Sequence, residues 1–584
     1  MMPCDGAAIA FGAMADDSHV LLRAFCDELA RCGMTDACTS PGSRSSPLVL
    51  ALAREPRLRA WSHVDERCAG FFALGLAKAS GRPAAVACTS GTAAAELAPA
   101  VHEAREARVA LLVLTADRPP ELREVGAGQV IDQVKLYGSA AKWSFEVGDH
   151  KATPERLRWM RALACRAYWT ALDGRAGAVH LNFALREPLV PTGELPPDAG
   201  GRPGRAPALD RAEADPLPTP GSLRRLVDAV EDRPRGVIVA GRWERGRALG
   251  LAAAGLSETT GYPILADPLS GARLSGVAVA HYDALLRDER WAAAHAPELV
   301  IRVGDLPTSK PLRAWLAATD GAEQVAIAPD GVVQDPDGVV SLALPADPAT
   351  TLAEVNEHVS RAPDAAWVAA WERADAAAAV AIGQALAAHE GLSEPLVAAE
   401  LGRLLPAGAT LVVASSMPVR DVETFFPARA DGPLVLSNRG ANGIDGTVST
   451  AFGVAAAADG PVVLLLGDVA LAHDVGGLLA AGRLGLKLTI VLLDNGGGGI
   501  FDFLPIAGQR DAFEEHVATP TGLDFSRAAA LYGADHRRVD ADLDRALDDA
   551  LASERTTILE VRTDRAANVA LHRRVWEAVS AALR

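Results

Sequence analysis

Short apolar runs alternate with longer segments rich in alanine and leucine from one end of the chain to the other. The runs are nearly continuous in apolar residues, which is the pattern of parallel strands that are covered on both faces. They comprise residues 84–90, 109–117, 236–242, 299–305, 410–416, 461–468 and 488–495. Helical stretches separate them, so the pattern predicts repeated βαβ units and an α/β fold of doubly wound parallel sheets.

Two stretches interrupt this alternation and divide the chain. Residues 192–219 are rich in proline, glycine and charge, which is typical of an exposed linker. Residues 351–384 contain Pro/Asp turns and the start of a polyalanine helix, and we interpret them as a connector. We therefore predict three α/β domains, at residues 1–191, 220–350 and 385–584.

Charge and cysteine content exclude several classes of function. The 584 residues include 57 Lys+Arg and 74 Asp+Glu, and the resulting net charge of −17 argues against bulk affinity for nucleic acid or an anionic membrane. An acidic substrate therefore needs a local basic cluster. The seven cysteines lie in the first third of the chain without a C-x-x-C pair, which favours a reducing cytoplasm over a disulfide framework or a zinc site. We expect no signal peptide and, without an uncharged apolar run of about 18 residues, no membrane span.

The strongest chemical pattern lies near the C-terminus, where two predicted strands end in oxygen-bearing side chains. One strand ends at Gly467-Asp468, and 27 residues after Asp468 the next ends at Asn495, followed by Gly496 to Gly499. Ligands of open α/β sheets bind at the carboxyl ends of strands, where these two side chains would be neighbours. Carboxylate and amide oxygens suit Mg²⁺, and a glycine run lets the backbone approach a diphosphate. Each piece alone is better explained as a helix cap or a turn, and only the pair favours a ligand site.

A second pattern places Glu66 at the start of a helix with alanine, glycine and leucine along one face. The helix is expected to stop at Gly81 and Pro83, and a strand and another helix follow. Small residues on one face predict close packing against another helix or another subunit. Taken alone, Glu66 is better explained as a first-turn carboxylate stabilised by the helix dipole.

Together the two patterns resemble the thiamine-diphosphate enzymes, and the resemblance covers almost the whole chain. In that family a glutamate contacts the aminopyrimidine from one domain, and a GD…N motif on another domain holds Mg²⁺ and the diphosphate. The resemblance implies thiamine diphosphate with Mg²⁺ or Mn²⁺ as cofactors, and a pyrimidine-binding, a central and a diphosphate-binding domain in that order. The implied metal ligands are Asp468, Asn495 and Gly497. The implied cofactor contacts are Glu66, Ser416, Met417, Ile444, Gly467, Asp468, Val469, Asn495, Gly499 and Ile500.

The chain departs from the family pattern at two places. The pair Asp494-Asn495 stands where relatives commonly have Asn-Asn, with the second position, the expected metal ligand, intact. Ala470 and Leu471 follow the GDV triplet where a serine often follows GDL in relatives. The second departure removes a hydroxyl near the diphosphate.

Six further segments resemble one branch of that family, the 2-succinyl-5-enolpyruvyl-6-hydroxy-3-cyclohexene-1-carboxylate synthases of menaquinone biosynthesis. They are SPGSRSSPL (40–48), TADRPPELREVGAGQ (115–129), TSKPLRAW (308–315), SSMPVRD (415–421), SNRGANGIDG (437–446) and GGGIF (497–501). The implied substrate site consists of Ser43, Arg44, Arg118, Gln129, Lys310, Ser416, Arg420, Arg439, Ile500 and Phe501. The implied catalytic residues are Glu66, Arg44, Arg118, Gln129, Arg420 and Arg439. Each arginine alone is more readily a surface residue, but the set explains how an acidic protein binds acids.

The resemblance implies a transferase reaction with a division of labour between cofactor and protein. Thiamine diphosphate forms a C2 carbanion, 2-oxoglutarate is decarboxylated, and its succinyl remainder adds to isochorismate. Glu66 is implied to hydrogen-bond N1′ of the aminopyrimidine, and Ile444 to separate the two cofactor rings and bend the cofactor. Apolar surroundings from Ile500 and Phe501 are expected to favour loss of the carboxylate charge.

The basic residues of the implied substrate site fall into two groups. Arg420 and Arg439 follow predicted strands of the third domain, and we expect them to hold the 2-oxoglutarate-derived part. Arg44, Arg118 and Lys310 lie on the other two domains, and we expect them to hold isochorismate. Relatives place the cofactor between subunits, so we also expect a homo-oligomer, at least a dimer and more specifically a tetramer.

Three alternatives stay open at this level. Another thiamine enzyme, such as an acetohydroxyacid synthase or a 2-oxoacid decarboxylase, is disfavoured by the SNRG and ADRPPEL segments. A nucleotide-binding protein is disfavoured because the glycines of GVIVAGRWERG are wrongly spaced for a dinucleotide fingerprint. A catalytically dead scaffold would not be expected to retain Glu66, Asp468 and Asn495 together.

Overall fold

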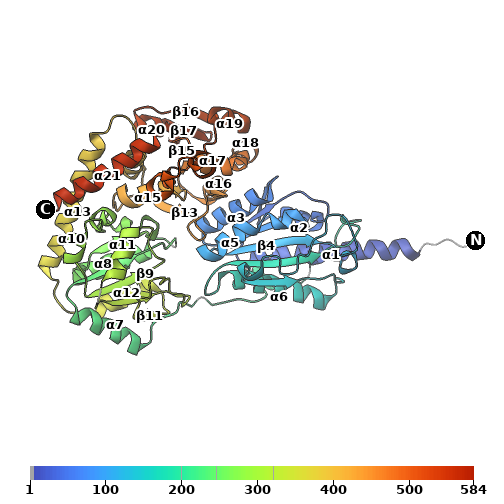
Figure 1. The fold of residues 1–584 in the computed structure, drawn as a ribbon. Coiled ribbons are helices and arrows are strands. Elements are labelled where there is room, and N and C mark those ends of the chain that lie inside the picture. Colours follow the sequence, from blue (N-terminus) through green and yellow to red (C-terminus); the bar gives the residue numbers. More distant parts are fainter. Residues whose placement is uncertain (1–5, 199, 213, 245, 320) are drawn as a thin grey trace, which may run out of the picture. The chain divides into compact units, whose positions relative to one another are not determined.

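The structure is a computed structural model that describes residues 6–198, 200–212, 214–244, 246–319 and 321–584. Three parallel sheets flanked by helices follow one another along the chain (Figure 1), which confirms the predicted α/β class. The chain divides into two compact units, one of residues 1–213, 438–458 and 473–486, and one of residues 214–437, 459–472 and 487–584. Within the described part of the chain, none of the helices combines the length and apolar content that a membrane span requires.

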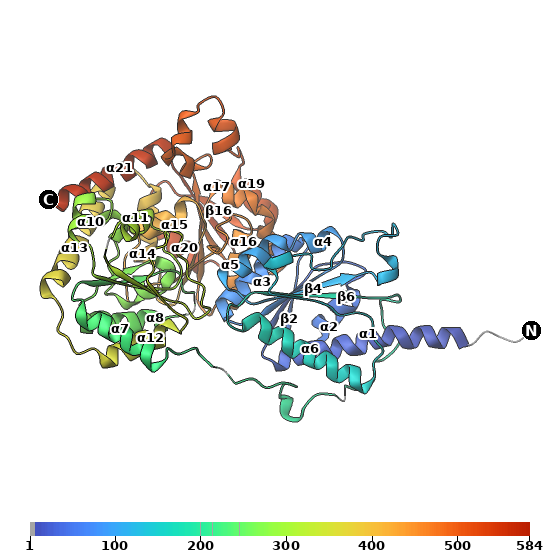
Figure 2. The same ribbon diagram turned by 60° about the horizontal axis from the view of Figure 1, so that its bottom comes forward.

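The first sheet has the strand order β2-β1-β3-β4-β6-β5, with every pair parallel. Its strands are β1 (Asp36–Thr39), β2 (Arg59–Ser62), β3 (Ala84–Cys88), β4 (Leu111–Asp117), β5 (Trp143–Glu146) and β6 (Ala178–Ala184). Its helices are α1 (Gly6–Arg31), α2 (Ser46–Arg54), α3 (Glu66–Ser80), α4 (Thr92–Ala95), α5 (Ala98–Ala107) and α6 (Pro154–Leu172). Strands β3, β4 and β6 are buried along their whole length, because α1, α2 and α6 cover one face and α3 and α5 the other (Figure 2).

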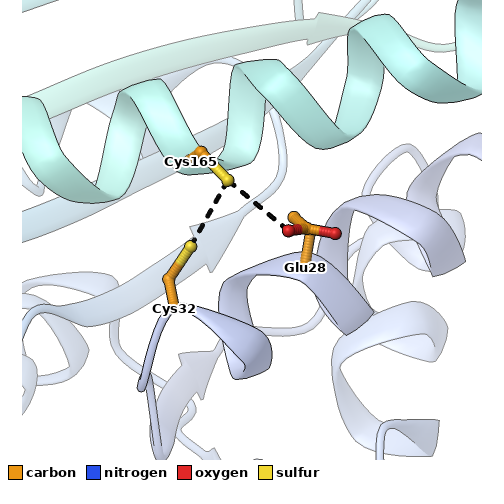
Figure 3. Close-up of side chains that lie close together, drawn as sticks. All are labelled: Glu28, Cys32 and Cys165. Atoms are coloured by element: carbon orange, nitrogen blue, oxygen red, sulfur yellow. Dashed lines mark hydrogen bonds between the residues drawn. The ribbon is translucent and has the colours of Figure 1, made fainter. Parts of the chain in front are cut away.

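A buried chain of hydrogen bonds joins the end of α1 to α6 (Figure 3). Cys32 Sγ donates to Cys165 Sγ at 3.6 Å, and Cys165 Sγ donates to Glu28 Oε1 at 3.5 Å. The same carboxylate accepts the Arg161 guanidinium at 2.8 Å and the backbone N–H of Ala208. Among the described residues these three side chains form the one group of three or more His, Cys, Asp or Glu that lie close enough together for a metal ion. Since the protein's own donors already satisfy the carboxylate, the cluster is explained as a polar link between two helices.

The second sheet has the order β11-β10-β9-β7-β8, again parallel. Its strands are β7 (Gly236–Ala240), β8 (Ile264–Ala266), β9 (Leu299–Val303), β10 (Glu323–Ile327) and β11 (Leu342–Leu344). The accompanying helices are α7 (Pro220–Asp232), α8 (Ala248–Thr260), α9 (Tyr282–Leu285), α10 (Glu289–Ala294), α11 (Lys310–Ala318), α12 (Pro348–His358) and α13 (Ala365–Ala387). The segment predicted as a linker, residues 192–219, has no helix or strand among its described residues except the short turn η3 (Pro203–Arg205).

The third sheet has the order β13-β12-β14-β15-β17-β16 and is parallel throughout. Its strands are β12 (Thr410–Val413), β13 (Leu434–Ser437), β14 (Val462–Gly467), β15 (Thr489–Asp494), β16 (Asp535–Arg538) and β17 (Thr557–Arg562). The helices in this part of the chain are α14 (Glu394–Leu404), α15 (Met417–Phe425), α16 (Thr447–Ala457), α17 (Asp468–His473), α18 (Leu479–Arg483), α19 (Phe525–Tyr532), α20 (Leu543–Ala552) and α21 (Arg565–Ala582), of which α16 and α18 belong to the first compact unit.

One apolar core continues from the second sheet into the third. It contains Val237 of β7, Val413 of β12 and Val463 of β14. The predicted connector, residues 351–384, forms most of α12 and α13, and Trp367 and Trp371 of α13 are buried in this core. The connector therefore packs as an integral part of the second compact unit, while the domain boundaries themselves stay a prediction.

The small-residue face that follows Glu66 packs against α16 of the same chain. A Cβ atom added at Gly75 of α3 would lie 2.9 Å from the backbone nitrogen of Val454, and one added at Gly453 of α16 would lie 3.0 Å from the Cα atom of Gly75. Only glycine permits this close approach of two backbones. Of the two partners that the sequence left open, the structure provides a helix of the same chain.

Candidate active site

The carboxyl edge of the third sheet carries the first group of predicted site residues. Strand β14 ends at Gly467 and Asp468 opens α17, while the neighbouring strand β15 ends at Asp494 and is followed by Asn495. The register pairs Gly467 with Leu493. Asp468 and Asn495 therefore leave adjacent strands at the same edge of the sheet.

Two buried oxygen atoms at this edge have no hydrogen-bond partner among the described residues, Asp468 Oδ2 and Asn495 Oδ1. Burial, and then the charge of neighbouring Asp494, raises the pKa of Asp468 to about 6, although the N–H of Gly497 donates to this carboxyl group. Buried acceptors without partners are costly unless a ligand binds them. A carboxylate and an amide oxygen are a donor set that Mg²⁺ prefers, so these residues fit a divalent cation.

The glycine run after Asn495 is required by its surroundings. Gly497 has a φ of +141°, and a Cβ atom added to it would lie 2.6 Å from the carbonyl oxygen of Ala518. Gly498 donates its N–H to the same oxygen at 2.6 Å. The carbonyl of Gly497 accepts the N–H of Gly499 at 2.9 Å and keeps a second lone pair for another ligand.

A carboxyl group that the sequence analysis missed lies behind Asn495. Glu394, the first residue of α14, is 1% exposed, and its Oε1 atom accepts Asn495 Nδ2 at 2.8 Å and Thr563 Oγ1 at 3.0 Å. Burial, and then the charge of Asp421, raises the pKa of Glu394 to about 7. Its sequence context, Ser393-Glu394-Pro395, is that of an ordinary helix start, so nothing local indicates this role.

Arg420 lies on α15, which follows the end of β12 along the chain. Its guanidinium donates to the carbonyl oxygen of Ser416, which has a φ of +76° at the start of the helix. Burial lowers the pKa of Arg420, with the charges of Asp421 and Asp283 opposing this shift. The arginine is therefore held close to its own helix start at the carboxyl edge of the third sheet.

Lys310 is exposed at the start of α11 on the second sheet. The preceding residue, Ser309, donates to Asp283 Oδ1 at 2.6 Å, and Thr424 of α15 donates to Asp283 Oδ2 at 3.1 Å. One buried carboxylate thus connects the start of α11 to the helix that carries Arg420. The remaining predicted residues of this unit are Met417, buried in α15; Val469, half-buried in α17; and Ile500 and Phe501, half-buried and exposed in the short helix η7 (Gly499–Phe503).

The carboxyl edge of the first sheet carries the second group of predicted residues. Arg118 follows β4 and donates to Ser90 Oγ and, at 3.0 Å, to the carbonyl of Gln129. Gln129 Nε2 donates to the carbonyl of Ser90 at 2.9 Å. Arg44, which follows β1, donates to the carbonyl of Leu185 at 2.8 Å. Burial and the charge of Arg44 lower the pKa of Arg118, so the structure brings the two guanidinium groups together.

Ser43 is exposed beside this cluster. Ser90 was not predicted as a site residue, although its side chain and carbonyl link Arg118 to Gln129. Its position after a predicted strand, in Ser90-Gly91-Thr92, is the signal that could have found it.

Glu66 is the first residue of α3 and lies at the carboxyl edge of the same sheet, after β2. Asp65 caps the helix by accepting the N–H of Cys68 at 3.1 Å. Glu66 is half-buried, and its pKa is raised by burial first and then by the charges of Asp65 and Glu96. A carboxyl group with a raised pKa suits a role in holding or sharing a proton.

Arg439 and Ile444 lie in the loop between β13 and α16, which groups with the first sheet. Glu103 of α5 accepts the N–H groups of Gly440 at 2.9 Å and Ala441 at 2.6 Å, which fixes this loop. Arg439 and Ile444 are half-buried. Arg439 and Arg420, which were predicted to act together, belong to different compact units, and their joint role stays a prediction.

Comparison with known families agrees with this arrangement. Residues 20–136 match the family described as "Thiamine pyrophosphate enzyme, N-terminal TPP binding domain", and residues 421–561 match "Thiamine pyrophosphate enzyme, C-terminal TPP binding domain". Residues 225–413 match "Middle domain of thiamine pyrophosphate". A solved structure described as "X-ray structure of a putative thiamin diphosphate-dependent enzyme isolated from Mycobacterium smegmatis" is similar with a TM-score of 0.68 at 20% identity, over 93% of this chain and 99% of that one, which supports the fold.

Curated relatives are similar over nearly the full length. The 2-succinyl-5-enolpyruvyl-6-hydroxy-3-cyclohexene-1-carboxylate synthase of Chloroflexus aurantiacus is 44% identical, over 96% of both chains. The proteins of the same name from Geobacillus kaustophilus and Myxococcus xanthus are 44% and 43% identical, over 97% and 96% of this chain and 99% and 97% of theirs. These similarities confirm the resemblance noted in the sequence, and the chain belongs to the family of 2-succinyl-5-enolpyruvyl-6-hydroxy-3-cyclohexene-1-carboxylate synthases, which are thiamine-diphosphate enzymes.

Proposed function

We propose that the protein decarboxylates 2-oxoglutarate and adds the succinyl remainder to isochorismate, releasing CO₂, in menaquinone biosynthesis. The product is 2-succinyl-5-enolpyruvyl-6-hydroxy-3-cyclohexene-1-carboxylate, and the cofactors are thiamine diphosphate and Mg²⁺ or Mn²⁺. The observation that carries the proposal is the pair of unpartnered buried oxygens, Asp468 Oδ2 and Asn495 Oδ1, at adjacent strand ends. In a thiamine-diphosphate enzyme, these two oxygens are the expected ligands of the cation that binds the diphosphate.

The diphosphate end of the cofactor is assigned to the third sheet. Asp468, Asn495 and the Gly497 carbonyl hold the cation, and the glycine turn leaves room for the diphosphate. Thiamine diphosphate, when bound, would supply the carbanion chemistry that decarboxylation of a 2-oxo acid requires. Glu66 would share a proton with N1′ of the aminopyrimidine, and its raised pKa suits this role.

The two substrates are assigned to different arginine clusters. Burial and then the charge of Arg44 lower the pKa of Arg118, with Asp117 and Glu187 opposing this shift, and the two carboxylates of isochorismate would add further partners for both guanidinium groups. Lys310 completes this group, while Ser43 and Gln129 orient the ligand. Arg420 and Arg439 hold the carboxylates that 2-oxoglutarate brings.

The assembly and the compartment are part of the same proposal. Each cofactor is shared between two copies of the chain, so the protein works as a homo-oligomer, at least a dimer and more specifically a tetramer. The cytoplasm is the proposed compartment, since the six cysteines among the described residues are buried and unbridged. Sedimentation at assay concentration tests the assembly, and a fully active monomer would contradict it.

The experiment for the reaction compares substrates. Purified protein is mixed with thiamine diphosphate, Mg²⁺, isochorismate and either 2-oxoglutarate or pyruvate, and the products are analysed by mass. With 2-oxoglutarate, CO₂ release and a succinyl adduct of isochorismate are expected, and pyruvate should give neither. Acetolactate from pyruvate, or an aldehyde as the main product of either acid, would favour another thiamine enzyme and overturn the proposal.

A further inference from the structure

We infer that Glu394 is a positioning residue for the metal site, because it holds the Asn495 amide with its nitrogen inward and its oxygen toward the cation. The inference rests on the proposed function, since it takes Asn495 as a metal ligand. Glu394 itself is not proposed to contact the metal or a substrate.

The hydrogen bonds of Glu394 determine which way the amide faces. Its Oε1 atom accepts two donors, Asn495 Nδ2 at 2.8 Å and Thr563 Oγ1 at 3.0 Å. As a carboxylate, Glu394 has no hydrogen to donate, so its contact with Asn495 requires the amide N–H. A protonated Glu394 keeps this arrangement when the proton lies on Oε2, because Oε1 already accepts the Thr563 hydroxyl.

The opposite side of the amide is the functional side. Nitrogen and oxygen lie on opposite sides of a planar amide, so fixing Nδ2 also aims Oδ1. Asn495 Oδ1 is buried without a partner, as is Asp468 Oδ2 on the adjacent strand end. The glycine turn confines the amide as well, because a Cβ atom added at Gly499 would lie 2.8 Å from Asn495 Nδ2.

A purely local role for this carboxyl group does not explain its position. Glu394 is 1% exposed and lies near the buried Asp421, and burying a carboxyl group in such a place is costly. The N-terminal end of α14, an 11-residue helix, offsets part of this cost through its dipole. The cap of this helix is supplied by Ser393, whose side chain accepts the N–H of Leu396 at 3.4 Å, so Glu394 is not needed for capping.

Three variants separate orientation from charge and packing. Glu394→Gln keeps an acceptor oxygen and removes the charge, whereas Glu394→Leu removes the acceptor at similar volume. Thr563→Val removes the other donor to Oε1 and leaves the bond to Asn495, so it is the matched control. Loss of residues that orient metal ligands typically weakens metal binding by roughly 10- to 100-fold.

The measurement is the affinity for Mn²⁺ at saturating thiamine diphosphate, read from the electron paramagnetic resonance signal of free Mn²⁺. We expect Glu394→Leu to weaken Mn²⁺ binding by roughly 10- to 100-fold, and Glu394→Gln and Thr563→Val to stay within a few-fold of the wild type. Equal binding by Glu394→Leu and the wild type would overturn the inference, as would equal loss in Glu394→Gln and Glu394→Leu. If the wild type itself bound no Mn²⁺ with the cofactor, the proposed function would fail instead.

A double-mutant cycle keeps the test decisive even if Glu394→Leu perturbs folding. In Asn495→Asp the side chain has two equivalent oxygens, so its orientation no longer matters. Adding Glu394→Leu to Asn495→Asp should then cause no further loss of Mn²⁺ affinity. The affinity should rather increase, because Glu394→Leu removes the carboxylate that repels the one introduced at position 495. The same loss in both backgrounds would show a general structural effect and contradict the positioning role.

Discussion

Replacing Gly75 by alanine tests how the fold positions Glu66. Gly75 lies on α3, the helix that Glu66 opens, at its closest approach to α16, the helix that follows Ile444. A Cβ atom there would lie 2.9 Å from the backbone nitrogen of Val454 and closer still to the carbonyl oxygen of Thr450. Both neighbours are backbone atoms, so neither can rotate away as a side chain would.

The magnitude follows from these distances. Ordinary contacts between heavy atoms are about 3.5–4.0 Å, and the Thr450 oxygen lies closer than the Val454 nitrogen, so α3 and α16 must separate by more than about 1 Å. Overpacking of this kind typically costs about 1–3 kcal/mol, and we expect the upper part of that range because backbone must move on both helices. The same movement displaces Glu66 relative to Ile444, and misplacement by about 1 Å can lower a catalytic rate by roughly 100-fold.

The assay combines urea unfolding with kcat at saturating thiamine diphosphate and Mg²⁺. Gly383→Ala in α13 is the matched control, because a Cβ atom added there meets nothing within 4 Å. The control should be neutral or stabilised by about 1 kcal/mol through helix propensity. Wild-type stability and kcat in Gly75→Ala would refute the argument that this helix contact fixes the position of Glu66.

Three further predictions address the chemistry and the core. Glu66→Gln should slow C2 proton exchange of bound thiamine diphosphate by roughly 10²- to 10⁴-fold while leaving its affinity unchanged, and near-normal exchange would reduce Glu66 to a structural residue. Arg118→Ala should spare CO₂ release from 2-oxoglutarate alone and slow the addition to isochorismate by about 10- to 100-fold, whereas Arg439→Ala should slow the release of CO₂ from 2-oxoglutarate. Circular dichroism of the intermediate that forms with 2-oxoglutarate alone distinguishes the two variants. The reverse pattern would show that the two arginines hold the opposite substrates. Burial lowers the pKa of His180 to about 4, from 6.5, so stability is lost as pH falls from 6.5 toward 4. Between pH 6.5 and pH 5, the free energy of unfolding of His180→Gln should therefore fall by about 2 kcal/mol less than that of the wild type. Equal losses of unfolding free energy, measured by thermal or urea unfolding, would show that His180 does not cause this pH dependence.

The sheets and the metal edge could be predicted because their signals are local. The runs at 461–468 and 488–495 are apolar throughout and end in Gly467-Asp468 and Asn495, and parallel strands place such ends at one edge. Glu394 could not be found in this way. It is 101 residues from Asn495, and its sequence context indicates only a helix start.

The arginine clusters show the same limit. Arg44 and Arg118 each follow a strand of the first sheet, but only the tertiary structure lets their charges interact and connects Arg118 to Gln129 through Ser90. Likewise, the glycines of α3 predicted a close partner without distinguishing a helix of the same chain from a second subunit. Contacts between distant segments depend on packing, which no single-sequence pattern records.

The proposed function requires that the unpartnered oxygens of Asp468 and Asn495 form the site for the metal and the diphosphate. The most direct measurement is calorimetric titration of thiamine diphosphate into the wild type and into Asp468→Ala, each with and without Mg²⁺. We expect tight binding only by the wild type with Mg²⁺, and a sharp loss of affinity in Asp468→Ala that excess Mg²⁺ does not fully restore. Unchanged binding of thiamine diphosphate by Asp468→Ala would contradict it.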